Sequence, residues 1–263
     1  MDLQLKGKLA LVTGSTAGIG LAIAKVFAGE GARVIVNGRT ESRVKAAADT
    51  IQRAHPSARV EQFAANLAEA GAANVLARYP AIDILVNNLG VYQVKPFEQT
   101  TDADWSSIIE TNFMSGVRLS RGWLPGMKAA GWGRIIFISS ESAVNIPAEM
   151  IHYGVTKTMQ VALARGLAET TAGTGVTVNS VLAGPTRSEG VDNFVADMAR
   201  SKSVSEAEIE KEFFRSIRPS SLLQRFASVD EVAAMVAFLA SPLSSATNGA
   251  ALRADGGVVR SIL

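Results

Sequence analysis

Thr13-Gly14-Ser15-Thr16-Ala17-Gly18-Ile19-Gly20 is the stretch that decides the fold. It separates an apolar run of buried-strand length, residues 8–12, from residues 21–28, whose apolar spacing suits a helix packed on a sheet. Glycines in a strand-to-helix turn let a ligand approach the backbone, and the free N–H groups at the helix start bind anions. The stretch therefore predicts a nucleotide phosphate site, with a tight turn that binds nothing as the alternative.

The composition is typical of a compact α/β protein and excludes several classes of site. The chain has 263 residues, 48% hydrophobic and 19% charged, which is enough for one domain with a sizeable core. A net charge of +2 gives no reason to expect nucleic acid or an anionic membrane as a partner. There is no cysteine, and His55 and His152 lie far apart, so no disulfide, thiolate or metal site is expected. Asp2, Lys6 and Lys8 argue against a signal peptide and no uncharged run spans a membrane, so a cytoplasmic protein is expected.

Strand-like and helix-like segments alternate along most of the chain. The expected strands are residues 8–12, 32–37, 59–63, 82–86, 134–138, 176–181 and 250–253. The expected helices are residues 21–28, 41–54, 67–78, 101–127, 150–171 and 228–240. Such alternation requires crossover connections, which make parallel sheets covered on both faces. We therefore predict one domain over residues 1–263, a doubly wound parallel sheet of about seven strands flanked by helices.

Residues 186–226 interrupt this alternation, because they are rich in charge and contain no clear strand. Ser205-Glu206-Ala207-Glu208 is a capping box that predicts a helix inside the segment. The segment follows the sixth strand, at the carboxyl edge where open α/β sheets bind ligands. It is expected to cover a substrate site, and a surface insertion is the alternative.

Five motifs together resemble those of the short-chain dehydrogenase/reductase family. They are Thr13-Gly14-x-x-x-Gly18-Ile19-Gly20, Asn87-Asn88-Leu89-Gly90, Ser140, Tyr153-x-x-x-Lys157 and Asp255-Gly256-Gly257, in the family's order and at its usual separations. The resemblance covers essentially the whole chain. It implies a Rossmann-type fold, an NAD(P)-dependent oxidoreductase, and a substrate lid at residues 186–226.

The side chains of Tyr153 and Lys157 are four residues apart on an expected helix and so share one face. A neighbouring lysine cation is expected to lower the phenol pKa, so that Tyr153 can exchange a proton with an alcohol or alkoxide. Ser140 follows a strand at the carboxyl edge and can hydrogen-bond the substrate oxygen, with Ser139 as the competing candidate. By the resemblance Asn112 completes the catalytic set through a water that connects the lysine to solvent; a structural asparagine is the alternative.

A serine hydrolase is the rival interpretation of Ser140, and the sequence argues against it. No Gly-x-Ser-x-Gly elbow surrounds this serine. His152 is adjacent to Tyr153 on the helix, so its ring points elsewhere and is expected to serve in packing.

The resemblance also assigns the cofactor-binding positions. These are Gly14, Ser15, Thr16, Gly18, Ile19, Gly20, Arg39, Asn66, Leu67, Asn87, Gly90, Tyr153, Lys157, Gly184 and Thr186. Three features depart from the family pattern: Leu89 replaces an alanine, Asn66 replaces an aspartate, and the proline in Ala183-Gly184-Pro185 is shifted. The carboxamide oxygen of Asn66 can still accept a hydrogen bond from the adenine amino group.

The end of the second strand predicts which cofactor is preferred. An NAD enzyme has an acidic residue there, which repels a 2′-phosphate, whereas this chain has Gly38. Arg39 and Arg43 follow, and guanidinium groups suit a phosphate. We predict that NADP(H) is preferred over NAD(H); solvated charges at a helix start are the alternative.

Two functions from different classes follow from these residues. The first is an oxidoreductase that moves hydride between the nicotinamide and a small carbonyl or secondary alcohol. The second is a catalytically silent dinucleotide-binding regulator or scaffold, which the intact catalytic set disfavours. By the resemblance the helices at residues 101–127 and 150–171 are expected to pair between subunits of a homotetramer, with a homodimer next.

Overall fold

The computed structural model describes residues 1–262, apart from the side chain of Phe194. Seven parallel strands form one sheet, in the order β3 (Arg59–Ala64), β2 (Arg33–Gly38), β1 (Leu9–Val12), β4 (Ile84–Asn87), β5 (Gly133–Ser140), β6 (Val176–Ala183) and β9 (Ala251–Ala254). The order reverses at β1, which pairs with β2 on one side and β4 on the other. This confirms the doubly wound sheet, and the reversal opens a crevice at the carboxyl end of β1.

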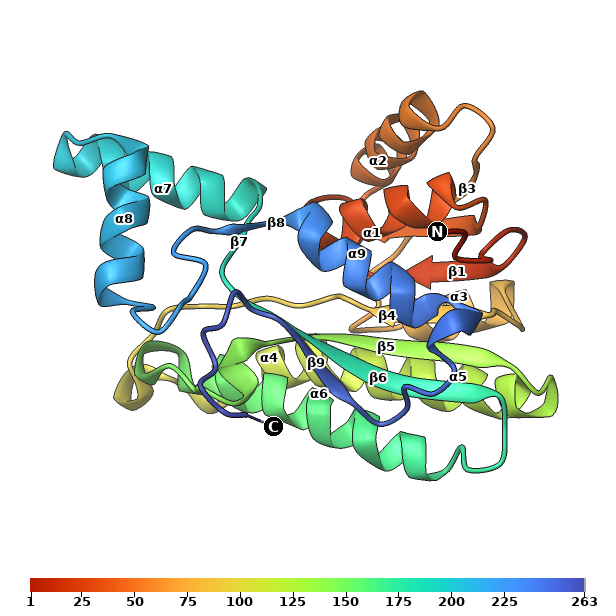
Figure 1. Ribbon diagram of the computed structural model, residues 1–263. Coiled ribbons are helices and arrows are strands. Elements are labelled where there is room, and N and C mark those ends of the chain that lie inside the picture. Colours follow the sequence, from red (N-terminus) through yellow and green to blue (C-terminus); the bar gives the residue numbers. More distant parts are fainter. Residues whose placement is uncertain (263) are drawn as a thin grey trace.

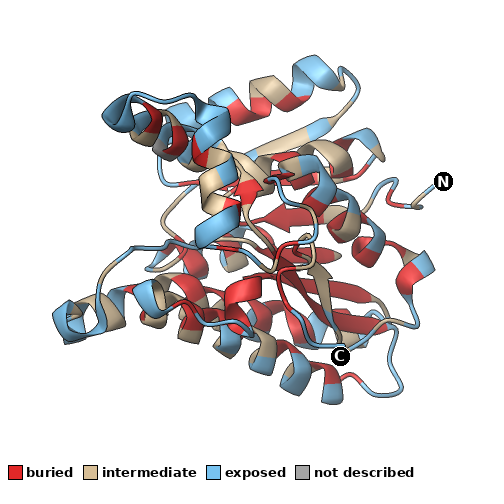
Figure 2. Cartoon of the chain, turned by 60° about the vertical axis from the view of Figure 1, so that its left-hand side comes forward, coloured by how far each residue is buried: buried red, intermediate tan, exposed pale blue. Residues whose placement is uncertain are grey.

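Helices cover both faces of the sheet (Figure 1). One face carries α1 (Gly18–Gly29), α2 (Glu41–Ala54) and α9 (Val229–Ala240). The other carries α3 (Gly71–Arg78), α4 (Asp102–Ile109), α5 (Ser115–Ala129) and α6 (Ile151–Glu169). Figure 2 shows the resulting pattern of burial: the strands are buried, and the helices expose only their outer sides.

The chain between β6 and α9 stands apart from these layers, at the upper left of Figure 1. It contains β7 (Thr186–Arg187), α7 (Glu189–Lys202) and α8 (Glu206–Ser216), and leads to β8 (Ala227–Ser228). It has an apolar cluster of its own, in which Val195, Ile209, Phe214 and Phe226 are buried. We call residues 186–226 the α7–α8 segment. It was expected to contain no strand, but β7 pairs with β8 over two residues.

Local end signals placed several helices correctly. Complete capping boxes begin α4 at Thr101, α8 at Ser205 and α9 at Ser228, each with an acidic residue at the third helical position. In each box the hydroxyl accepts a backbone N–H while the carboxylate accepts the N–H of the cap, so two unpaired donors are satisfied.

Two expected helices have different bounds in the structure. The helix expected at residues 67–78 begins at Gly71, because residues 66–69 form a turn in which Asn66 Oδ1 accepts the Ala68 N–H at 3.2 Å. The helix expected at residues 101–127 is divided into α4 and α5 by a π-helical turn, Glu110–Met114, and continues to Ala129. Such turns often occur at functional sites, and this one contains Asn112.

Candidate active site

The glycine-rich loop between β1 and α1 requires its glycines. Gly14 and Gly18 have φ angles of +61° and +56°, which side-chain-bearing residues rarely adopt. A Cβ at Gly20 would lie 2.5 Å from Asn88 Nδ2 and 2.6 Å from the Gly14 oxygen. The cap of α1 is Ala17, whose side chain cannot accept a hydrogen bond, so the loop presents the backbone donors of the first turn. This cradle fits a dinucleotide pyrophosphate.

Thr13 and Asn88 hold this loop against the end of β4. Thr13 Oγ1 accepts the N–H groups of Asn88 and Leu89 at 2.9 and 2.8 Å. Asn88 Nδ2 donates to the backbone oxygens of Thr13 and Gly14 at 2.9 and 3.1 Å. Neither side chain was predicted to hold the loop in place, although Thr13 and Asn88 both belong to the family motifs.

Ser15 supports the loop from within. Its Oγ donates to the Val12 oxygen at 2.7 Å and accepts the Asn37 N–H at 3.0 Å, and the residue is fully buried. Asn37 also accepts the Gly14 N–H at 3.2 Å through Oδ1. The side chain of Ser15 therefore fixes the shape of the loop, and its backbone N–H also donates within the protein, to the Asn37 oxygen at 2.8 Å.

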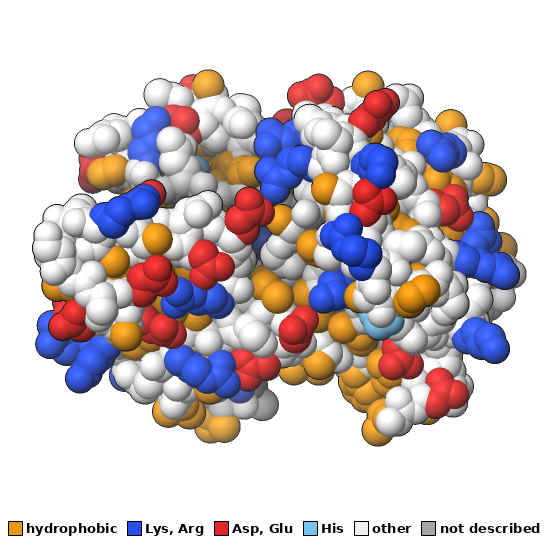
Figure 3. Space-filling model, turned by 90° about the horizontal axis from the view of Figure 1, so that it is seen from above, with side chains coloured by type: hydrophobic (Ala, Val, Ile, Leu, Met, Phe, Trp, Pro, Cys, Tyr) orange, Lys and Arg blue, Asp and Glu red, His pale blue; other side chains and the backbone are white. Residues whose placement is uncertain are grey.

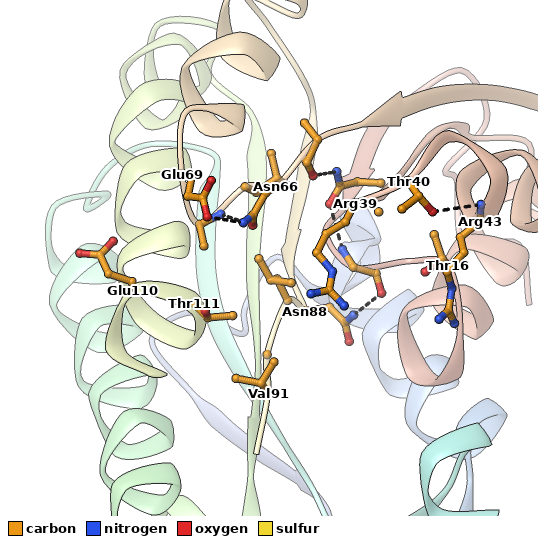
Figure 4. Close-up of a pocket in the computed structure, with 18 of the residues that line it drawn as sticks. Thr16, Arg39, Thr40, Arg43, Asn66, Glu69, Asn88, Val91, Glu110 and Thr111 are labelled. Atoms are coloured by element: carbon orange, nitrogen blue, oxygen red, sulfur yellow. Dashed lines mark hydrogen bonds between the residues drawn. The ribbon is translucent and has the colours of Figure 1, made fainter. Parts of the chain in front are cut away.

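A cavity of about 920 Å³ lies beside the loop, and Figure 4 shows the side chains that line it. Six predicted cofactor residues belong to this lining: Gly14, Thr16, Arg39, Asn66, Leu67 and Gly90. Arg43 and Asn88 also line it. In Figure 4 the side chain of Arg39 extends toward Asn88, while the guanidinium of Arg43 lies near Thr16.

The other predicted cofactor residues lie around the cavity. Asn87 is buried at the end of β4, where its Nδ2 donates to Ser120 Oγ at 3.3 Å. Gly184 packs tightly against the chain after β9, since a Cβ there would lie 2.5 Å from the Asp255 oxygen. Thr186 Oγ1 donates to the Gly184 oxygen at 2.9 Å, so this pair forms the turn that leads into the α7–α8 segment.

The floor of the cavity contains two constraints that the sequence did not reveal. A Cβ at Gly38 would lie 2.4 Å from Thr16 Cγ2, so any side chain there must displace Thr16. Asn66 Oδ1 is used within its own turn, and its Nδ2 donates to Glu69 Oε1 at 2.8 Å. The acceptor predicted for an adenine amino group is therefore already engaged.

The catalytic candidates meet where β5 ends and α6 begins. Ser140 is the last residue of β5, and hydrogen bonding between its side chain and Tyr153 favours the phenolate. Ser139 Oγ instead donates to the Lys157 carbonyl at 2.9 Å, which anchors α6 on the strand. The two serines are thereby distinguished, and Ser140 is the one beside the tyrosine.

Lys157 is a buried cation that reaches toward the end of β4. Its Nζ donates to the Ile138 oxygen at 2.8 Å and lies 5.6 Å from the centre of the Tyr153 ring. A Cβ at Gly90 would lie 3.4 Å from Nζ and 3.5 Å from Asn112 Oδ1, so the glycine leaves these two groups uncovered. Burial lowers the pKa of Lys157 to about 8.

The expected effect of Lys157 on the tyrosine is wrong in this structure. The pKa of Tyr153 is raised to about 12, chiefly by burial and in part by the nearby Glu141 carboxylate. Hydrogen bonding with Ser140 and the charge of Arg218 oppose this rise but do not overcome it. Desolvation of the phenolate is the largest cause because the side chain is half-buried, whereas the lysine ammonium points to a backbone carbonyl.

Asn112 fastens the chain after β4 to α6. Its Oδ1 accepts the Val91 N–H at 2.8 Å, while its Nδ2 donates to the Val91 oxygen at 2.9 Å and to Thr156 Oγ1 at 3.1 Å. Its own carbonyl accepts Gln160 Nε2 at 2.5 Å. Thr156 and Gln160 were missed by sequence analysis, which had no signal linking them to a residue more than forty positions away.

A buried ion pair beside the catalytic serine was also missed. Glu141 directly follows Ser140, and its Oε1 accepts Arg218 Nε at 2.8 Å. Burial raises the pKa of the Glu141 carboxyl, and the arginine opposes this. A glutamate directly after Ser139-Ser140, at the end of a strand, was the available signal. The pair joins the catalytic strand to the far end of the α7–α8 segment.

The His152 ring packs against Trp105, in agreement with the packing role expected from its position. The residue is buried, and its ring meets the edge of Trp105 with the centroids 6.0 Å apart. Over the described residues, no group of three or more histidine, aspartate or glutamate side chains is arranged to hold a metal ion. No helix in the same part of the chain is long and apolar enough to cross a membrane.

The family model for short chain dehydrogenases matches residues 8–199 of the chain. This protein belongs to the short-chain dehydrogenase/reductase family. It is 47% identical to the uncharacterized oxidoreductase YvaG of Bacillus subtilis, over all of both chains. It is 35% identical to a D-β-hydroxybutyrate dehydrogenase of Cupriavidus necator, over 97% of this chain and 99% of that one.

Among solved structures, the short-chain dehydrogenase resembles L-sorbose reductase of Gluconobacter frateurii complexed with NADPH and L-sorbose. The TM-score is 0.92 at 30% identity, and all of both chains are covered. The resemblance in motifs is thus confirmed over the whole chain. The protein is an NAD(P)-dependent oxidoreductase, and no comparison supports the silent scaffold.

Proposed function

We propose that this short-chain dehydrogenase transfers hydride between NADP(H) and a small carbonyl or secondary alcohol. One observation carries the proposal: the cavity beside the glycine loop has two arginines at one end and, at the other, Gly90, which borders Lys157 and Asn112. The relatives act on a hydroxy acid and on a sugar, as their names state, and both substrates undergo the same change at one carbon.

The side chains divide the proton chemistry between them. The bound nicotinamide supplies the hydride chemistry. Tyr153 Oη donates a proton to the developing alkoxide, and accepts one in the reverse direction. Ser140 Oγ hydrogen-bonds the same substrate oxygen. Lys157 contributes positive charge and holds the cofactor ribose, while Asn112 positions the Gly90–Val91 chain that passes between them.

The high pKa of Tyr153 suits it as a proton donor, since the phenol stays protonated at neutral pH. To act as a base, Tyr153 must first lose its proton, and this requires more positive charge near the half-buried phenol than the protein alone supplies. A cationic nicotinamide would add that charge beside the Lys157 ammonium, so the pKa of Tyr153 is expected to fall when oxidised cofactor binds.

The turnover experiment compares Tyr153→Phe with the unmodified protein in a screen of ketones and secondary alcohols, followed by NADPH absorbance. Tyr153→Phe is expected to lose turnover while keeping the Kd of NADPH, because it removes only the proton donor. Lys157→Ala is expected to weaken both turnover and NADPH binding, since the lysine supplies positive charge and holds the cofactor ribose. Normal turnover by the phenylalanine variant would contradict the mechanism.

The cofactor preference is tested separately. A charge-assisted hydrogen bond is worth about 1.5–3 kcal/mol, so Arg39→Gln is expected to weaken NADPH binding about ten- to a hundredfold and to leave NADH unchanged. Arg39 is a better position to change than Gly38, because an acidic side chain in place of Gly38 would displace Thr16. Tighter binding of NADH than NADPH by the unmodified protein would overturn the preference.

We further propose that residues 1–263 form one catalytic unit in which the α7–α8 segment is the substrate lid, and that the protein is a cytoplasmic homotetramer. The helices proposed to pair between subunits, α4–α5 and α6, cover the same face of the sheet. Light scattering at micromolar concentration tests the assembly: a tetramer mass is expected, and a monomer mass would contradict it.

A further inference from the structure

Glu189 places a carboxylate at the edge of the cofactor cavity. It is the first residue of α7, and its Oε2 lies 3.4 Å from Arg43 Nη2. Arg43 belongs to α2 and lines the cavity together with Arg39. The pair therefore links the α7–α8 segment to one of the two arginines that the proposed function assigns to the cofactor phosphate.

The position of Glu189 is set by the elements around it. Just before it, β7 pairs with β8 in register. Arg187 then donates to Asp192 at 2.6 Å, to Glu206 at 2.7 Å and to Glu210 at 3.2 Å, which ties the start of α7 to α8. The tether between this anchor and Glu189 is one residue long, so the carboxylate is held close to where it stands.

The same turn packs against the phosphate loop. A Cβ at Gly18 would lie 3.5 Å from Ser188 Cβ, so the residue before Glu189 lies beside the first residue of α1. Seen from above, the surface is hollowed between the α7–α8 side and the α1–α2–α9 side, and charged side chains of both signs stand on its rims (Figure 3). Glu189 of α7 and Arg43 of α2 link these two sides of the molecule.

We propose that Glu189 moderates cofactor specificity, by holding Arg43 and so opposing the binding of a 2′-phosphate. This rests on the proposed function. A carboxylate and a phosphate compete for the same guanidinium, and two anions on one arginine repel each other. A cofactor without the 2′-phosphate makes no demand on Arg43, so Glu189 lowers the affinity for NADPH and leaves that for NADH unchanged.

The expected effect is modest because the pair is exposed. The side chains of Arg43 and Glu189 are 58% and 64% exposed, and exposed pairs of this kind change an equilibrium by no more than about fivefold. Salt screens such pairs, so the effect is expected at low ionic strength and to shrink as salt is added. Glu189 thus moderates the preference for NADP(H) and does not reverse it.

The experiment measures Kd for Glu189→Gln and the unmodified protein with two matched pairs of ligands: NADPH with NADH, and 2′,5′-ADP with AMP. Glu189→Gln is expected to tighten NADPH and 2′,5′-ADP about two- to fivefold at low salt, and to leave NADH and AMP unchanged. In an Arg43→Gln background the gain is expected to shrink, because the competition acts on Arg43.

Asp197→Asn is the matched control, since it removes the same charge from the same helix at a residue paired with Arg200. It is expected to leave all four constants unchanged. An equal gain from Asp197→Asn, an equal gain for NADH, or no gain at all would overturn the role of Glu189. Failure of the unmodified protein to bind either dinucleotide would instead contradict the proposed function.

Discussion

Several ion pairs join the α7–α8 segment to the rest of the molecule, and two of them, near its opposite ends, differ in burial. At its start, Glu189 and Arg43 are more than half exposed. At its end, Arg218 and Glu141 are 10% and 4% exposed, and their Nε–Oε1 distance is 2.8 Å. The charges are alike, but an exposed pair is worth little, whereas breaking a buried pair leaves a desolvated charge behind.

This difference indicates how the segment is attached. The end beside Ser140 is fixed, because separating Arg218 from Glu141 would strand a carboxylate next to the catalytic serine. At the end above the phosphate loop the ion pair itself is adjustable, because water can replace either partner at little cost, while the β7–β8 pairing keeps the backbone in place. A segment held in this way can respond to the cofactor without disturbing the catalytic strand.

The largest expected effect comes from removing each arginine in turn. Arg218→Gln is expected to lower the free energy of unfolding by about 3–5 kcal/mol, and Arg43→Gln by less than about 1 kcal/mol. Replacing both buried partners, as Glu141→Leu with Arg218→Met, is expected to recover most of that loss, since no unpaired charge remains. Urea unfolding measures all three, and equal losses for the two single variants would contradict the comparison.

Lys157 is a third buried charge to compare with the two ion pairs, because its ammonium has a hydrogen bond to the Ile138 carbonyl and no carboxylate partner among the described residues. Its pKa is about 8 in the folded protein, below the ordinary lysine value of 10.5. Below pH 8 both states bind the proton and folding carries the full cost of burial; between pH 8 and 10.5 the unfolded state binds more protons, so stability rises with pH. The gap of 2.5 units corresponds to about 3 kcal/mol.

Lys157→Met is expected to lack this dependence. Relative to the variant, the unmodified protein should gain about 3 kcal/mol of unfolding free energy between pH 7 and pH 10.5. Losing the hydrogen bond to Ile138 shifts the difference by a constant and leaves its slope intact. Denaturant unfolding across this range checks it, and parallel pH curves for the two proteins would contradict the buried charge.

What the sequence could predict was local. The capping boxes at Thr101, Ser205 and Ser228 involve residues three apart, and the glycine loop is set by backbone angles and close approach. The two ion pairs join residues 77 and 146 positions apart, which no pattern in a single sequence connects. The raised pKa of Tyr153 was missed for a similar reason, because it depends on how far the fold removes the phenol from water.

The N-caps Ser205 and Ser228 allow the stability of the α7–α8 segment to be compared directly with that of the core. Each caps a helix through the same box, and replacing either with alanine is expected to cost about 1 kcal/mol. The loss from Ser228→Ala should appear in global unfolding, since α9 packs against the sheet. The loss from Ser205→Ala should appear as faster hydrogen exchange in α8, with little change in global stability. Equal global losses would show that the segment unfolds together with the core.

The smallest expected effect lies at the end of α7. Ser203 has a φ of 54° and a ψ of 41°, and the Val204 N–H bonds to the Ala199 oxygen at 3.1 Å, a helix ending that favours glycine at Ser203. By contrast, the chain after α1 has Gly31, with a φ of +81°.

Ser203→Gly is expected to stabilise α7 by about 0.5 kcal/mol, because relief of the left-handed conformation exceeds the added freedom of glycine when unfolded. Ser201→Gly, two residues earlier inside the helix, is the matched control and should destabilise it by a similar amount. Hydrogen exchange of the α7 amides measures both, and changes of the same sign would contradict the assigned ending.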